Sequence, residues 1–194
     1  MRRVLFYLLC SFLCLFGYSQ EGAAQRTSNK TVHLGLSQQV SCYSIPSGGL
    51  DLNGGMYLMH SYWKAGISAT DYNQKISGTN VNGEYFDHAH FIAYGEWMYR
   101  IFATYSRNIN VYAGGGIFLG CNAYELFRKL PKEYRTGYPS AEFIYGLRPS
   151  VEMEAFVSRN VAIVVGVHSP ITFSSSVSKD IWHVVGSLGV RVNL

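Results

Sequence analysis

Charged residues are scarce in this sequence. Asp, Glu, Lys and Arg make up 14% of its 194 residues, whereas a typical soluble domain carries about 25%. The formal net charge of +4 is small and spread along the chain, so the sequence predicts no direct nucleic-acid partner. Intrinsic disorder is excluded as well, because 15 Tyr, 11 Phe and 20 Gly accompany the low charge.

Long apolar runs are absent apart from residues 4–16, which follow two arginines. This run is shorter than the roughly 20 residues that a membrane-spanning helix needs. The layout predicts a secretory signal peptide over residues 1–19. We expect cleavage after Ser19, with Ala24 as the second choice; an uncleaved anchor is the alternative.

Cysteine is also scarce, with four residues in the chain. Removal of the signal peptide leaves Cys42 and Cys121, together with fourteen basic and twelve acidic residues. Two cysteines in an exported protein can pair. These two fall on expected strands that lie across the fold from each other, so we predict free thiols.

Motifs of catalysis and cofactor binding are lacking: the chain has no G-x-S-x-G, P-loop, dinucleotide fingerprint or C-x-x-C. Asp87, His88 and His90 form a candidate metal group, but H-x-H with no further ligand nearby favours a pair at the rim of a loop. Three other histidines are candidates to face the interior: His33, His168 and His183. We predict that the protein is not an enzyme and has no catalytic residue, cofactor or metal.

What the sequence does contain is alternation of apolar and polar residues with a period of two, which predicts β-strands. Near the end of the chain, Val190, Val192 and Leu194 alternate with polar residues such as Arg191. The second expected strand includes residues 53–55, Asn-Gly-Gly, which also suit a turn. The expected strands are 31–42, 49–58, 61–74, 89–104, 109–124, 140–157, 160–173 and 181–194.

The apolar faces of these strands are expected to point outward. The polar faces are rich in Gly and poor in Lys, and small residues leave space for Arg and Tyr in a narrow interior. The apolar faces carry aromatic residues such as Trp63, Trp97 and Phe143, as in the aromatic girdles of membrane barrels. The sequence therefore predicts an all-β fold, an eight-stranded antiparallel transmembrane β-barrel. A soluble ligand-binding barrel is the structural alternative.

The connections between the expected strands alternate in length, as they do in outer-membrane barrels. Short ones lie at residues 105–108 and 158–160, and longer ones lie at 44–48, 74–87, 125–139 and 174–180. An even number of strands places both termini on one side, which the export signal makes the periplasm. We expect residues 20–30 to form a short extension and residues 31–194 to form one barrel domain in the outer membrane of a Gram-negative bacterium, in contact with outer-membrane lipid.

Seven charged residues lie on the polar faces: Lys64, Glu96, Arg100, Arg148, Glu152, Glu154 and Arg191. A charge facing lipid costs about 2–4 kcal/mol near the bilayer midplane, so we expect all seven inside the barrel. There they predict a salt-bridged plug, with a selective pore or a proton-linked site as the alternative.

One expected outer connection, residues 127–135, is strongly basic. Its basic residues are Arg128, Lys129, Lys132 and Arg135. They are candidates for contact with anionic lipopolysaccharide or a partner protein, and a solvated loop is the alternative.

The chain ends in Ser187-x-Gly189-x-x-Val192-x-Leu194. This pattern resembles the terminal signal of bacterial outer-membrane barrels, in which the last residue is usually Phe. It predicts recognition for outer-membrane assembly.

Several spaced motifs over residues 60–194 resemble the TraO family of conjugative-transposon transfer proteins. They are GEWMYRIF at 95–102, RNINVYAGGGIFLG at 107–120, LFRKL at 126–130, FIYG at 143–146, PITF at 170–173 and GVRVNL at 189–194. The resemblance implies a role in conjugal DNA transfer at the outer membrane, with other conjugation proteins as partners, and it implies no catalytic residues. The alternatives are a generic small outer-membrane barrel for adhesion or envelope integrity, and a lipid-modifying barrel enzyme.

Overall fold

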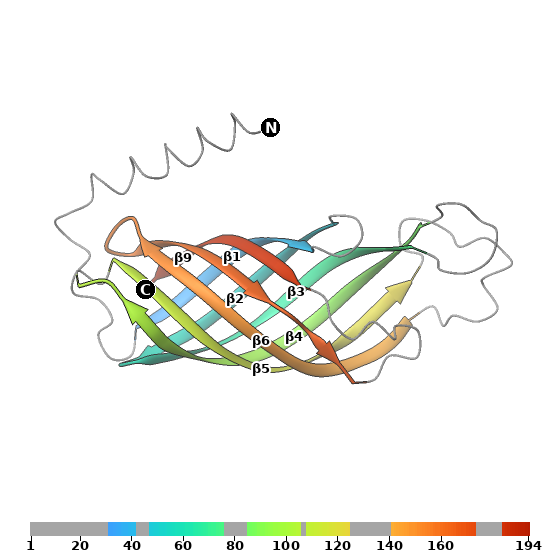
Figure 1. Ribbon diagram of the computed structural model, residues 1–194, viewed down its shortest axis with the longest axis horizontal. Helices are drawn as coiled ribbons and strands as arrows, with labels where there is room; N and C mark the ends of the chain where they lie inside the picture. Colours follow the sequence, from blue (N-terminus) through green and yellow to red (C-terminus); the bar gives the residue numbers. More distant parts are fainter. Residues whose placement is uncertain (1–30, 42–46, 76–84, 106–107, 125–140, 174–183) are drawn as a thin grey trace, which may run out of the picture.

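The structure is a computed structural model that describes residues 31–41, 47–75, 85–105, 108–124, 141–173 and 184–194. Within these ranges the chain forms nine β-strands (Figure 1). They are β1 (Val32–Ser41), β2 (Ser47–Leu58), β3 (Ser61–Lys75), β4 (Tyr85–Ala103), β5 (Ile109–Tyr124), β6 (Ala141–Phe156), β7 (Val161–His168), β8 (Ile171–Thr172) and β9 (Val185–Asn193). Over the same ranges, no helix has the length and apolar character needed to cross a membrane.

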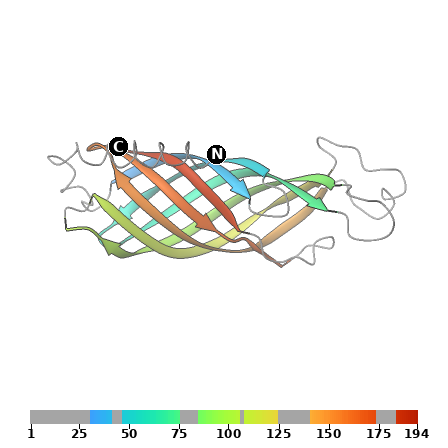
Figure 2. The same cartoon turned by 45° about the horizontal axis from the view of Figure 1, so that its top comes forward.

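The strands close on themselves into a barrel, which Figure 2 shows from a second side. β1 to β6 pair antiparallel in chain order, β6 pairs with β7, β7 with β9, and β9 with β1. β7 and β8 occupy one position in this ring. The described residues therefore form a closed eight-stranded antiparallel barrel, which confirms the predicted fold class.

The expected strand over residues 160–173 is divided into β7 and β8 at Pro170. Its ladder with β6 keeps one register throughout, since Ser150 pairs with His168 and Leu147 pairs with Ile171. Ser169 N still donates to the carbonyl of Pro149 at 3.1 Å. Pro149 lies opposite Ser169 and has no N–H to donate in return to the Ser169 carbonyl, which explains the interruption.

The other strand boundaries follow the expected ranges with two differences: β2 begins at Ser47 instead of residue 49, and β4 begins at Tyr85 instead of residue 89. β5 covers the expected residues 109–124, and β2 runs through residues 53–55 without a turn. Because β4 extends beyond residue 89, His90 lies inside the strand and not at its edge, and its side chain is buried. The expectation of a pair at a loop rim was wrong for this residue.

Along each strand, side chains point alternately into the barrel and out to its surface. On β4, Glu96 and Met98 are 3% and 0% exposed, whereas Trp97 between them is 53% exposed. β6 repeats this, with Arg148 buried and the neighbouring Leu147 exposed. The barrel therefore has an apolar outer surface and a largely polar interior.

The end of the chain and the start of β1 lie together at one end of the barrel, here called the terminal end. Leu194 N donates to the carbonyl of Val32 at 2.9 Å, and Asn193 N donates to that of Asn160 at 2.7 Å. The short connections expected at residues 105–108 and 158–160 belong to this end, because Phe156 N donates to the carbonyl of Asn108. Most residues of the longer expected connections lie outside the described ranges.

Candidate functional site in the barrel interior

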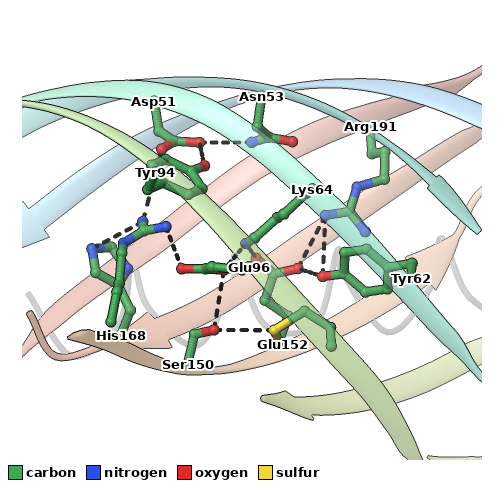
Figure 3. Close-up of polar contacts among 12 residues, drawn as sticks. Asp51, Asn53, Tyr62, Lys64, Tyr94, Glu96, Ser150, Glu152, His168 and Arg191 are labelled. Atoms are coloured by element: carbon green, nitrogen blue, oxygen red, sulfur yellow. Dashed lines mark hydrogen bonds and ion pairs between the residues drawn. The ribbon is translucent and has the colours of Figure 1, made fainter. Parts of the chain in front are cut away.

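Ion pairs from three strands meet at the centre of the barrel (Figure 3). Lys64 on β3 and Glu96 on β4 are direct cross-strand partners, and Lys64 Nζ lies 2.9 Å from Glu96 Oε2. Lys64 also binds Glu152 on β6. Arg148 Nη1 donates to Glu96 Oε1 at 2.5 Å. All four side chains are buried, because the period of two turns each of them inward.

Arg191 on β9 extends this cluster toward the terminal end. Its guanidinium nitrogens lie 3.0 Å from Glu152 Oε2 and 3.2 Å from Glu154 Oε1. The hydroxyl of Tyr62 donates to Glu152 and that of Tyr57 donates to Glu154. The guanidinium also lies over the Tyr62 ring, 4.9 Å from its centroid. Two aromatic hydroxyls and one arginine thus hold both glutamates.

Arg148 extends the cluster in the opposite direction. It stacks on the ring of Tyr94 at 3.8 Å and lies 3.2 Å from His168 Nε2. Its Nη2 is 3.8 Å from Asp51 Oδ2, and the Tyr94 hydroxyl donates to Asp51 Oδ1 at 2.9 Å. We call the connected charged residues the lumen network. Its members are Asp51, Lys64, Glu96, Arg148, Glu152, Glu154 and Arg191.

Alternation on β4 places Tyr94 on the inward face with Glu96, whereas Asp51, Tyr57 and Tyr62 were not among the predicted interior residues. Asp51, Asn53, Gly55 and Tyr57 follow one another with a period of two on β2, and all four are buried. The alternation that identified Glu96 and Arg148 is therefore also the signal for Asp51 and Tyr57.

Arg100 lies near the terminal end of β4. It follows Met98 on the inward face of that strand, and its side chain is half-buried. Its Nη2 lies 3.0 Å from His60 Nδ1. The place of Arg100 in a salt-bridged plug stays a prediction.

The lumen network leaves little empty space beside it. The cavity beside Asp51, Lys64, Arg148, Glu152 and Arg191 has a volume of about 20 Å³, enough for about one water molecule. Charges buried at this depth are stabilised by close opposite charges and hydrogen bonds. The arrangement can tie six strands together and obstruct passage along the barrel axis.

Other candidate residues lie apart from this site. Over the described ranges, no group of three or more His, Cys, Asp and Glu side chains is placed to hold a metal ion. His33 is buried between the rings of Tyr57 and Tyr62, at 5.0 and 5.6 Å. Cys121 is a free thiol on the outer surface. The candidates outside the described residues are Cys42, Asp87 and His88 as side chains, His183, Arg128, Lys129, Lys132 and Arg135.

Comparison with known proteins bears on the fold. No protein-family model matches the chain, and no curated protein matches its sequence. Similar solved structures include the outer membrane protein OprG from Pseudomonas aeruginosa, with a TM-score of 0.59 and 10% identity over 89% of this chain and 98% of that one. Neisserial surface protein A matches with a TM-score of 0.56 and 16% identity, over 86% of this chain and 98% of that one.

A third similar structure is Ail, the attachment invasion locus protein of Yersinia pestis, in complex with the heparin analogue sucrose octasulfate. Its TM-score is 0.52 at 11% identity, over 86% of this chain and 98% of that one. At these identities the likeness establishes the fold alone. The chain has the fold of small outer-membrane β-barrels, and the resemblance to TraO proteins stays a prediction.

Proposed function

We propose that this protein is a small outer-membrane barrel with a closed interior, which acts through contacts made at its surface and not by transport or catalysis. The observation that carries this proposal is the lumen network, which fills the barrel with paired charges while the outer wall is apolar. Export by the signal peptide at residues 1–19 and periplasmic termini belong to the same proposal. Outer-membrane lipid is the proposed partner of the apolar outer wall.

Conductance measurement tests the closed interior. The purified full-length protein in planar bilayers is expected to give no steady single-channel current, because only about 20 Å³ is open beside the network. Fractionation of cells is expected to recover the protein with the outer membrane. A large steady current would contradict the closed interior, and recovery in the soluble periplasm would contradict the membrane location.

The surface contact is proposed for the basic segment at residues 127–135. This segment connects β5 to β6, so it follows the end of β5 that is opposite the terminal end. Ail, which shares the fold, has been solved with a sulfated heparin analogue. Four basic residues within eight positions, Arg128 to Arg135, are suited to a polyanionic surface of this kind. An adhesion or envelope role follows from that chemistry.

Binding to immobilised heparin tests this contact. Replacement of Arg128, Lys129, Lys132 and Arg135 together by Glu is expected to abolish retention at moderate salt, because attraction becomes repulsion. The control is Arg159→Glu at the terminal end, which is expected to leave retention unchanged. Equal retention of both variants would contradict the assignment.

A second candidate function is an accessory role in conjugation, which the spaced TraO-like motifs favour. The motifs at 95–102 and 143–146 lie within β4 and β6, and most of those at 107–120 and 189–194 lies in β5 and β9, so the resemblance follows structural elements along the chain. The partners would be other conjugation proteins, with no direct contact to DNA. A clean deletion is expected to lower transfer frequency and to disturb assembly of the other mating proteins. Unchanged transfer would contradict this candidate.

A further inference from the structure

The charges of the lumen network form a chain in which acids and bases alternate. Each member contacts the next, and the order toward the terminal end is Asp51, Arg148, Glu96, Lys64, Glu152, Arg191 and Glu154. An acid therefore stands at each end of this alternating chain. With every group ionised, four carboxylates against three cations would leave a net charge of −1 inside the barrel.

The histidines beside the alternating chain do not supply the missing positive charge. Arg148 Nη2 lies 3.2 Å from His168 Nε2. A guanidinium can only donate, so this nitrogen accepts the hydrogen bond and His168 is neutral. His33 is fully buried, and its ring nitrogens make no hydrogen bond to the described residues, so an imidazolium there would be costly. Arg100 is partly exposed at the terminal end, where solvent screens its charge.

The acid at one end of the alternating chain has donors on both oxygens. Asp51 Oδ1 accepts from the Tyr94 hydroxyl at 2.9 Å and from the Asn53 amide at 2.6 Å (Figure 3). Asp51 Oδ2 accepts from the Gln39 amide at 3.5 Å and lies 3.8 Å from Arg148 Nη2. These contacts suit an ionised carboxylate.

Glu154, at the other end, has donors on one oxygen only. Its Oε1 accepts from the Tyr57 hydroxyl and from Arg191. Its Oε2 is buried and makes no hydrogen bond to the described residues. Glu154 also shares Arg191 with Glu152, which lies two residues away on the same face of β6. Ionised, Glu154 would be a buried carboxylate with one oxygen undonated, which is costly.

The Tyr112 hydroxyl on β5 lies near Glu154. It is buried and, like Glu154 Oε2, has no hydrogen-bond partner among the described residues. A proton on Oε2 has the Tyr112 oxygen available as its acceptor. In the opposite arrangement the hydroxyl would donate to an ionised Oε2, but a neutral hydroxyl would leave the net charge of the alternating chain in place.

We propose that the lumen network binds one proton, held on Glu154 Oε2 at neutral pH. Three carboxylates then balance three cations. A metal ion has no place at this oxygen, because Oε2 is buried and Glu154 does not line the cavity of about 20 Å³. This inference rests on the closed interior proposed above, since an open lumen would let water and salt ions balance the charge.

Infrared spectroscopy of the full-length protein in micelles at neutral pH tests the proposal, because a protonated carboxyl group has a carbonyl stretch that a carboxylate lacks. Wild-type protein is expected to show this acid band, and Glu154→Gln is expected to lose it. Tyr57→Phe is expected to shift the band to higher wavenumber, because the carbonyl oxygen loses a donor. Tyr94→Phe is the matched control, since its hydroxyl binds Asp51, and it is expected to leave the band unchanged.

Urea unfolding gives a second measurement. Glu154→Gln is expected to keep the wild-type midpoint, because glutamine has the shape and the neutrality of the protonated acid. Glu152→Gln makes the same change two residues away and is expected to lower the midpoint, because it removes an ionised partner of Lys64 and Arg191. Equal lowering by both variants would overturn the proposal.

Absence of the acid band from the wild type would also overturn it. A band that Tyr94→Phe shifts and Tyr57→Phe does not would place the proton on Asp51 and overturn the choice of Glu154. A higher midpoint in sodium than in choline salt, in a protein without the band, would show a metal cation in place of the proton. The conductance measurement tests the closed interior separately, so a missing band in a non-conducting barrel contradicts the proton alone.

Discussion

At the scale of single residues, Glu152 links side chains from three strands of the barrel. It binds Lys64, Arg191 and Tyr62, which come from β3 and β9, while Glu152 itself is on β6. Loss of its carboxylate would leave two buried cations each with one acidic partner fewer. Removal of one member of a buried ion pair costs about 3–5 kcal/mol.

Glu152→Ala is therefore expected to lower the free energy of unfolding by about 3–5 kcal/mol. The measurement is the midpoint of urea unfolding in micelles, followed by the heat-dependent shift of the barrel on gels. Arg159→Ala is the control, because Arg159 is exposed in the turn between β6 and β7 and exposed charges contribute about 1 kcal/mol or less. Similar midpoints for the two variants would show that the lumen network does not stabilise the barrel.

Glycines act at the scale of strand packing. The sequence argument assigned inward glycines to provide space across the interior. Gly66 does so in part, since a Cβ there would lie 2.7 Å from the Tyr94 hydroxyl and also 2.7 Å from the carbonyl oxygen of Leu52. At Gly116 the nearest atoms all belong to the backbone of β4. A Cβ at this position would lie 1.7 Å from the carbonyl oxygen of Gly95 on β4. Gly116 is therefore required for the close approach of β5 to β4.

Gly116→Ala is expected to destabilise the barrel by about 1–3 kcal/mol, as other overpacking substitutions do, because backbone and not a flexible side chain must move. Gly95→Ala is the matched control on the neighbouring strand, since its Cβ would meet nothing within 4 Å. Thermal unfolding of both variants in micelles measures the difference. Equal transition temperatures would refute the backbone contact.

At the scale of the whole molecule, β9 closes the barrel. It pairs with β1 along nine residues and with β7 along eight, and it also carries Arg191 into the lumen network. The end of the chain therefore combines ring closure, interior charge pairing and the terminal pattern that resembles an assembly signal.

Deletion of residues 190–194 is expected to abolish assembly, because it removes four of the nine residue pairs between β1 and β9 together with the end of the terminal pattern. Arg191→Met keeps the strand and the pattern, so its barrel is expected to assemble and to be less stable. Heat-modifiable protein in the outer-membrane fraction measures assembly. Normal barrels from the truncated chain would refute the role of this segment.

The sequence by itself determined the fold class, the number of strands and the division into apolar and polar faces. These properties depend on alternation with a period of two, which needs only neighbouring residues such as Glu96, Trp97 and Met98. Pro149 can be located in the same way, but the hydrogen bond that it fails to donate depends on its place opposite Ser169. The roles of the basic segment at residues 127–135 and of the TraO-like motifs are predicted from the sequence alone.

The tertiary structure alone decided which charges meet. Lys64 and Glu152 are 88 residues apart in the chain, and their contact depends on how a closed, staggered sheet places β3 opposite β6. The same stagger puts Asp51 beside Arg148 and leaves Arg100 near the terminal end. Alternation determines whether a side chain points into the barrel or away from it. The position of the side chain along the barrel axis, and therefore its partner, depends on the register of every strand in the ring.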